Sequence, residues 1–392
     1  MANLIEFIDN NETKIVSTRG PLLGAHTSDV HFGVTGISVE EQYTILKEQF
    51  VNPIKELPID YVAINGDVFD HKSMSSSDMV MYAIKFINDI VYEVCKPKGI
   101  PLIIIGGTYN HDANQLKLFY HLMENKSIDV RIIENIQFTY IKTKTGGMAK
   151  VLCIPELYGI AESIYNEFLF ESGLYDMCLM HGTIKGSVPQ DKVGEGRLFH
   201  IEDFINCMGP VIAGHVHGGG CFNKHFYYCG SPYSWRFDDD YRKGFLLTAH
   251  NLDTHQYYVH KELIHSFRYE TINLDFMLEA DPKSIIDYIN KLKEEQGIDY
   301  IKITFEKEVS PATKQAINNF LKNSKDKAEF NFTKQDKIVK ENLARIEELQ
   351  KYSYLYDKSL NPYDKFARYI NESMGEVVIS GDELKELAEE EI

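Results

Sequence analysis

The chain has 392 residues, enough for two or three domains and for a sizeable buried core. Hydrophobic residues make up 44% and charged residues 25%, which argues against a wholly disordered or fibrous chain. The 41 basic and 58 acidic residues give a formal net charge of −17, which argues against a protein that coats nucleic acid through a basic surface.

The first part of the chain repeats one pattern, in which a short apolar run precedes a turn rich in Gly, Asp and His. Five such runs predict strands at residues 22–25, 61–64, 101–105, 177–180 and 210–213. An amphipathic helix before residues 96–99 is predicted by the helical spacing of Met79, Ala83, Phe86, Ile90 and Val94. Strands that alternate with helices predict an α/β layered domain over residues 21–270.

The composition changes after about residue 270. Helical patterns at 285–292 and 312–321, with strand-like runs at 301–305 and 328–332, predict a small α+β module over residues 271–340. Beyond it, residues 341–392 predict two helices on either side of a turn near Asn361-Pro362. Residues 1–20 form an N-terminal extension.

Targeting signals are not evident in the sequence. No apolar run approaches the roughly 20 residues of a membrane span, and residues 1–11 lack the pattern of a secretion signal. The six cysteines show no CxxC spacing, so we expect reduced, mostly buried thiols. These features predict a cytoplasmic protein with no membrane partner.

Five of the expected strand ends carry residues that ligate hard or borderline metals. They are Asp29 and His31, Asp67, Asn110, His181, and the pair His215 and His217. In open α/β sheets the carboxyl ends of the strands form the binding crevice, so we expect these side chains to meet there. D-x-H and H-x-H pairs in an extended chain place both side chains on one face. Each motif alone is weak, but their combination in this order predicts a metal centre.

The number of ligands indicates two ions rather than one. Seven nitrogen and oxygen ligands exceed the needs of one ion, whereas two ions bridged by Asp67 would use them well. Imidazole, carboxylate and amide ligands without thiolate suit Mn²⁺, Fe or Zn²⁺. Two ions about 4 Å apart can polarise a phosphoryl group and activate a bridging water. Asp70 and Asp112 are candidates for carboxylates that orient ligating imidazoles or cap the turns.

The sequence resembles the calcineurin-like dinuclear metallophosphoesterases, and among them the SbcD-type DNA-repair nucleases. The resemblance covers roughly residues 20–250 and rests on these segments: His26-Thr27-Ser28-Asp29-Val30-His31, Gly66-Asp67-Val68-Phe69-Asp70, Asn110-His111-Asp112, Gly214-His215-Val216-His217, and Tyr228-Cys229-Gly230-Ser231-Pro232 with Lys243-Gly244-Phe245. It implies a β-sandwich flanked by helices, a small DNA-capping module and a helical tail that binds an SbcC-type ATPase.

The resemblance also implies roles for the site residues. One Mn²⁺ would be held by Asp29, His31, Asp67 and His217. The second would be held by Asp67, Asn110, His181 and His215. His111 would be the catalytic histidine at the leaving oxygen. The implied activity is Mn²⁺-dependent cleavage of duplex DNA ends and of single strands, by a homodimer within a heterotetramer with the ATPase.

The usual Gly-Asn-His-Asp turn of the family is two residues longer here, as Gly107-Thr108-Tyr109-Asn110-His111-Asp112. The two extra residues either shift Asn110 or bulge the loop ahead of it. Two alternatives stay open: a phosphatase or phosphodiesterase acting on a non-DNA substrate, and a catalytically weakened scaffold that binds DNA ends for the ATPase. The lysine-rich residues 314–340 are either a solvated helix face or a contact to the DNA backbone.

Overall fold

The computed structural model describes residues 19–74, 77–112, 114–188, 196–237, 242–322 and 325–330, and a few isolated positions after residue 360. The chain divides into two compact units, the first with limits Met1–Ile272, Ile286–Lys302 and Asn323–Lys327, and the second with limits Asn273–Ile285, Ile303–Lys322 and Ala328–Ile392. Most of the N-terminal extension, the tail helices and the part of the lysine-rich stretch after residue 330 lie outside the described residues. The division into four segments stays a prediction.

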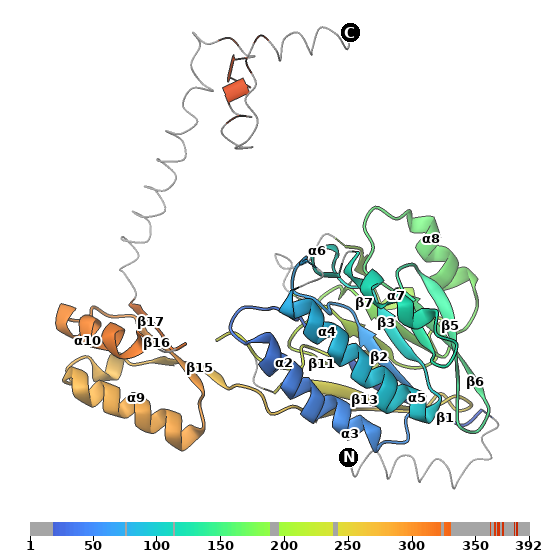
Figure 1. Cartoon of the computed structure of the whole chain (residues 1–392), viewed down its shortest axis with the longest axis horizontal. Helices are drawn as coiled ribbons and strands as arrows, with labels where there is room; N and C mark the ends of the chain where they lie inside the picture. Colours follow the sequence, from blue (N-terminus) through green and yellow to red (C-terminus); the bar gives the residue numbers. More distant parts are fainter. Residues whose placement is uncertain are drawn as a thin grey trace. The chain divides into compact units, whose positions relative to one another are not determined.

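The first sheet is mixed and has the strand order β14-β13-β1-β2-β3-β4 (Figure 1). Its strands are β1 (Pro21–Thr27), β2 (Tyr61–Asn65), β3 (Leu102–Ile105), β4 (Val130–Ile133), β13 (Gly244–Asn251) and β14 (Tyr257–Leu263). Strands β1 to β4 run parallel, whereas β13 pairs antiparallel with both β1 and β14. The predicted strands at 22–25, 61–64 and 101–105 are confirmed.

The second sheet is also mixed, with the order β11-β12-β10-β7-β6-β5. Its strands are β5 (Gln137–Lys142), β6 (Met148–Ile154), β7 (Met177–His181), β10 (Val211–Gly214), β11 (Gly220–Asn223) and β12 (Phe226–Tyr228). The four central strands β6, β7, β10 and β12 are parallel. The predicted strands at 177–180 and 210–213 are thus confirmed. Two short strands between β7 and β10 in the sequence, β8 (Thr183–Ile184) and β9 (Leu198–Phe199), pair with each other in parallel.

Two long helices follow β1 and β2, and each contains a π-helical turn. The first comprises α2 (Val39–Leu46), η1 (Lys47–Val51) and α3 (Asn52–Lys55); the second comprises α4 (Asp78–Asp89), η2 (Ile90–Cys95) and α5 (Lys96–Lys98). Ser38 and Ser77 cap their N-termini by accepting backbone N–H bonds, and Gly99 ends the second helix in the left-handed conformation. The predicted amphipathic helix is therefore confirmed. Shorter helices are α6 (Tyr109–Asp112), η3 (Gln115–Phe119), α7 (Tyr120–Met123), α8 (Glu162–Asn166), η4 (Glu167–Glu171) and η6 (Ile201–Phe204).

Three hydrophobic cores order these elements into an α/β fold. One core joins residues of both six-stranded sheets, including Ala63 and Ile103 from the first and Val151 and Leu179 from the second, so the sheets pack face to face. A second core lies between the first sheet and the helices α2 to α4, which cover its other face (Figure 1). A third core packs α8, η4 and η6 on the second sheet. Because the central strands are covered on both sides, they are buried along nearly their whole length.

The sequence after residue 268 forms a three-stranded sheet, in the order β15-β16-β17, and two helices. These elements are β15 (Tyr269–Asn273), η7 (Asp275–Met277), α9 (Pro282–Gln296), β16 (Tyr300–Phe305), α10 (Pro311–Leu321) and β17 (Lys327–Phe330). The α+β composition predicted here is confirmed over the described residues. Within that described part of the chain, no helix combines the length and apolarity needed to cross a membrane. All six cysteines are free thiols.

Candidate metal centre

The carboxyl ends of six parallel strands supply the polar side chains of one cluster. Asp29 and His31 follow β1, Asp67 follows β2, and Thr108 and His111 follow β3 in the first sheet. Glu156 follows β6, His181 ends β7, and His215 and His217 follow β10 in the second sheet. Each of the two facing sheets thus contributes three strand ends to the cluster. Six of the predicted metal ligands take part in groups whose donor atoms lie within 4.8 Å of one another: Asp29, His31, Asp67, His181, His215 and His217.

One group of donors consists of Asp29, His31 and His217. The Nε2 atoms of His31 and His217 lie 3.1 Å apart, and His217 Nε2 lies 3.9 Å from Asp29 Oδ1. Burial lowers the pKa of His31 to about 4 and also lowers the pKa of His217. Both rings are therefore neutral near pH 7, which is the form of histidine that ligates metals.

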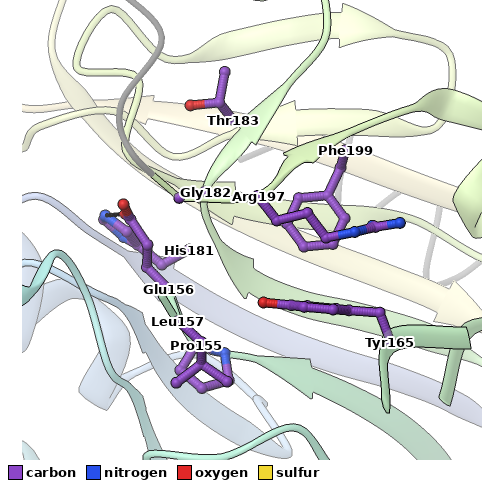
Figure 2. Close-up of a pocket in the computed structure, with 10 residues that line it drawn as sticks. Pro155, Glu156, Leu157, Tyr165, His181, Gly182, Thr183, Arg197 and Phe199 are labelled. Carbon is purple, nitrogen blue, oxygen red and sulfur yellow. Dashed lines mark ion pairs between the residues drawn. The ribbon is translucent and has the colours of Figure 1, made fainter. Parts of the chain in front are cut away.

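A second group consists of Glu156, His181 and His215. Glu156 Oε2 lies 3.5 Å from His181 Nε2 and 3.3 Å from His215 Nδ1. Figure 2 shows Glu156 and His181 side by side at one end of a pocket, with the guanidinium of Arg197 directed away from them. His181 Nδ1 donates to the carbonyl of Asn65 at 2.7 Å, so its Nε2 faces the carboxylates. A backbone carbonyl on the outer ring nitrogen is the usual way to fix a ligating histidine.

Asp67 connects the two groups. Its Oδ2 lies 3.3 Å from His181 Nε2 and 3.7 Å from His31 Nε2. Burial alone would raise the pKa of Asp67, but the charge of His181 and its hydrogen bond to Asp67 hold it well below its usual range. Conversely, burial would lower the pKa of His181, but Asp67 raises it. Asp67 is therefore an ionised carboxylate, the form that ligates a cation.

The backbone conformation at the site is unusual. Asp29, His31, Asp67 and His215 all have positive φ, at 49°, 48°, 53° and 93°. Such conformations cost on the order of 1–2 kcal/mol per non-glycine residue and are concentrated at functional sites. The loops after β1 and β2 support each other, since Asp29 N donates to the carbonyl of Gly66 and His31 N to that of Asp67, both at 3.0 Å.

Two glycines allow the strands to approach His181. A Cβ at Gly66, where φ is 88°, would lie 2.1 Å from His181 Nδ1. A Cβ at Gly214 would lie 2.0 Å from the carbonyl oxygen of Asn65, the acceptor of that same Nδ1. Both contacts are too short for any side chain. Glycine is therefore needed at both positions.

His111 lies at the edge of the first group. Its ring is 4.7 Å from that of His31, centroid to centroid, and it shares a donor group with His31 and Asp67. Its Nδ1 donates to the carbonyl of Asp70. The Nε2 atom is therefore the nitrogen available to exchange a proton.

The two outer carboxylates have different surroundings. Asp70 Oδ1 lies 3.6 Å from His31 Nδ1. Asp112 is buried and accepts four backbone N–H bonds, from Asp67, Val68, Phe69 and Gly107, at 2.9–3.2 Å. It thereby fixes the turn that presents Asp67.

Asn110 is placed differently from the other predicted ligands. It is exposed and lies on α6, the short helix formed by the longer turn. Thr108, two residues earlier, instead contacts Asp67: its N–H donates to Oδ1 at 2.7 Å and its hydroxyl to Oδ2 at 3.1 Å. No hydrogen bond joins Asn110 to the other predicted ligands among the described residues.

Sequence reasoning missed Glu156, although a signal for it exists. Asp29 and Asp67 each stand two residues beyond the end of a parallel strand, and Glu156 stands at the same position after β6. Residues 148–154 were not recognised as a strand, so the Pro155-Glu156 turn was overlooked. Trp235 was missed as well; this single tryptophan packs against His31 and His217, with ring centroids 5.6 and 5.3 Å away.

The donor set suits divalent metal ions. It combines carboxylates with imidazoles and contains no thiolate. Comparison of the chain with protein-family models and with curated proteins gave no match. The interpretation of this site therefore rests on its geometry and on the motifs in the sequence.

Proposed function

We propose that this chain is a Mn²⁺-dependent DNA nuclease subunit of the SbcD-type, calcineurin-like metallophosphoesterase class. The single observation that supports it most is the meeting of Asp29, His31, Asp67, His181, His215 and His217 at four strand ends, those of β1, β2, β7 and β10. The two face-to-face sheets between helical layers also fit the fold expected of that class.

The donor groups suggest how two ions would be held. Asp29, His31 and His217 would bind one ion, His181 and His215 the other, and Asp67 would contribute to both. Two ions at such a centre supply Lewis-acid activation of a phosphodiester and a water of lowered pKa. The residues hold this geometry in advance, because their loops are tied by the hydrogen bonds of Asp112 and by the strained backbone at Asp29 and Asp67.

His111 would act as a general acid and donate a proton to the leaving oxygen. The carbonyl of Asp70 fixes its Nδ1 as a donor, which leaves Nε2 to carry a proton toward the site. General acid catalysis of this kind contributes about 10²–10⁴-fold.

The proposed biological role is DNA end processing, repair or recombination together with an SbcC-type ATPase, as a homodimer within a heterotetramer in the cytoplasm. The net charge of −17 is compatible with this role, because two bound ions would add about +4 at the cleft and reverse its local potential. DNA would then be held by the ions, by local lysines and by the partner.

A cleavage assay tests this proposal. We expect the purified chain, alone and with its ATPase partner, to degrade linear duplex DNA and single strands with Mn²⁺ and not with a chelator. His111→Ala should reduce the rate at least about 100-fold and retain the fold. His121→Ala is the matched control, because His121 is exposed on α7 outside the cluster.

The outcome also separates the two alternatives. Hydrolysis of a phosphomonoester or a phosphoprotein with intact DNA would show a phosphatase. DNA-end binding without hydrolysis of any phosphoester would show a scaffold. Either result would contradict the nuclease proposal.

A further inference from the structure

The space beside His181 and His215 is occupied by a carboxylate rather than by the carboxamide that the sequence motif suggests. The longer turn after β3 places Thr108 against Asp67 and carries Asn110 onto the exposed side of α6. Glu156, from the neighbouring strand end, reaches the two histidines instead.

The carboxylate of Glu156 is fixed in this position. Its side chain is only 5% exposed. Tyr158 donates its hydroxyl proton to Oε1 at 2.6 Å, and the backbone N–H of Glu156 donates to the carbonyl of Gly106 at 3.0 Å. Oε2 is thereby directed at His181 Nε2, His215 Nδ1 and the Thr108 hydroxyl, at 3.5, 3.3 and 3.3 Å.

These separations match the edges of a metal coordination shell. With metal–ligand bonds of about 2.0–2.2 Å, neighbouring ligand atoms around a tetrahedral or octahedral ion lie about 2.8–3.6 Å apart. The distances from Glu156 Oε2 to both ring nitrogens, and the 3.3 Å between His181 Nε2 and Asp67 Oδ2, lie within that range. A single ion could therefore contact Glu156, His181 and His215, with Asp67 beside it next to His181.

We propose that Glu156, and not Asn110, completes the second metal site with Asp67, His181 and His215. This inference rests on the metal centre of the proposed function and adds a ligand to it. An anionic ligand in place of a neutral amide strengthens the binding of a divalent ion, because it adds a full negative charge beside the cation. Tyr158 is a positioning residue, since it acts through Oε1 of Glu156.

Metal binding tests the inference without reference to catalysis. Mn²⁺ binding to the full chain is measured by isothermal titration calorimetry, while the fluorescence of Trp235 reports the ion next to His31 and His217. We expect Glu156→Gln to weaken one Mn²⁺ affinity at least about tenfold and to leave the Trp235-reported affinity within about twofold. Asn110→Ala and the exposed control Glu171→Gln should leave both affinities within about twofold.

Two further variants keep the test decisive. If Glu156→Gln unfolds, Tyr158→Phe should weaken the same ion by a smaller factor. Thr183→Ser, whose side chain lies apart from Glu156 in Figure 2, should not. Unchanged affinity in the Glu156 and Tyr158 variants would show that Glu156 only forms an ion pair with the histidines and would overturn the inference. Loss of the second ion in Asn110→Ala would also overturn it. Neither result would decide DNA cleavage, which the nuclease assay measures separately.

Discussion

The substitution Asp112→Asn tests how the turn carrying Asp67 is held. Asp112 Oδ1 accepts from Val68 and Phe69, and Oδ2 accepts from Asp67 and Gly107. An asparagine of the same shape keeps one oxygen and presents an NH₂ group to the other pair of N–H donors. Two buried backbone donors would then lose their partner.

The expected loss of stability follows from that count. Each unsatisfied buried donor costs about 1–3 kcal/mol, so Asp112→Asn should lower the free energy of unfolding by about 2–6 kcal/mol. Burial and the charge of Asp67 raise the pKa of Asp112 to about 7. The stabilities of the native chain and Asp112→Asn should therefore be compared at a pH above that pKa, where the native carboxylate is ionised.

Urea unfolding of the metal-free protein measures this loss. Asp287→Asn serves as the matched control, because Asp287 is exposed on α9 and should change stability by less than about 0.5 kcal/mol. A loss below about 1 kcal/mol for Asp112→Asn would refute the reasoning, since it would mean that the four hydrogen bonds do not support the turn.

Three other predictions concern packing, pH and metal. Gly214→Ala should abolish Mn²⁺ binding in calorimetry because its Cβ would lie 2.0 Å from the carbonyl oxygen of Asn65. The control Gly218→Ala, whose new Cβ has no atom within 4 Å, should bind Mn²⁺ normally. Equal Mn²⁺ binding by the two variants would contradict the packing argument. Burial lowers the pKa of His26 to about 3. Between about pH 6.5 and pH 3 the unfolded chain therefore binds one more proton than the folded chain. The free energy of unfolding should fall by about 1.4 kcal/mol per pH unit as the pH drops through that range. Urea unfolding at a series of pH values should show a shallower slope for His26→Gln, and parallel slopes would exclude this role. Mn²⁺ at about 100 times its Kd should stabilise the native chain by about 2.7 kcal/mol per ion. Calorimetric melting measures this gain in stability. We expect the gain to vanish with a chelator and to be smaller in Asp67→Asn.

The sequence predicts much of this fold because its central strands are strongly apolar. Runs such as 101–105 stand between turns that only a few residue types can form, so strands β1, β2, β3, β7 and β10 could be recognised. Their shared direction then indicates that Asp29, Asp67 and His181 meet at one edge.

Two features of the site could not be obtained in the same way. The conformation of the longer turn depends on whether Thr108 or Asn110 reaches Asp67, and local sequence does not decide between them. Glu156 depends on the packing of one sheet against the other, which brings it to His181 and His215 from another strand end. Its place two residues beyond a strand becomes a signal only once residues 148–154 are known to form β6.

A diffraction measurement at the manganese absorption edge, on crystals of the full chain grown with Mn²⁺, would count and locate the bound ions. We expect two anomalous peaks on either side of Asp67, one contacted by Asp29, His31 and His217 and the other by Glu156, His181 and His215. A single peak, or none at these residues, would contradict a dinuclear centre.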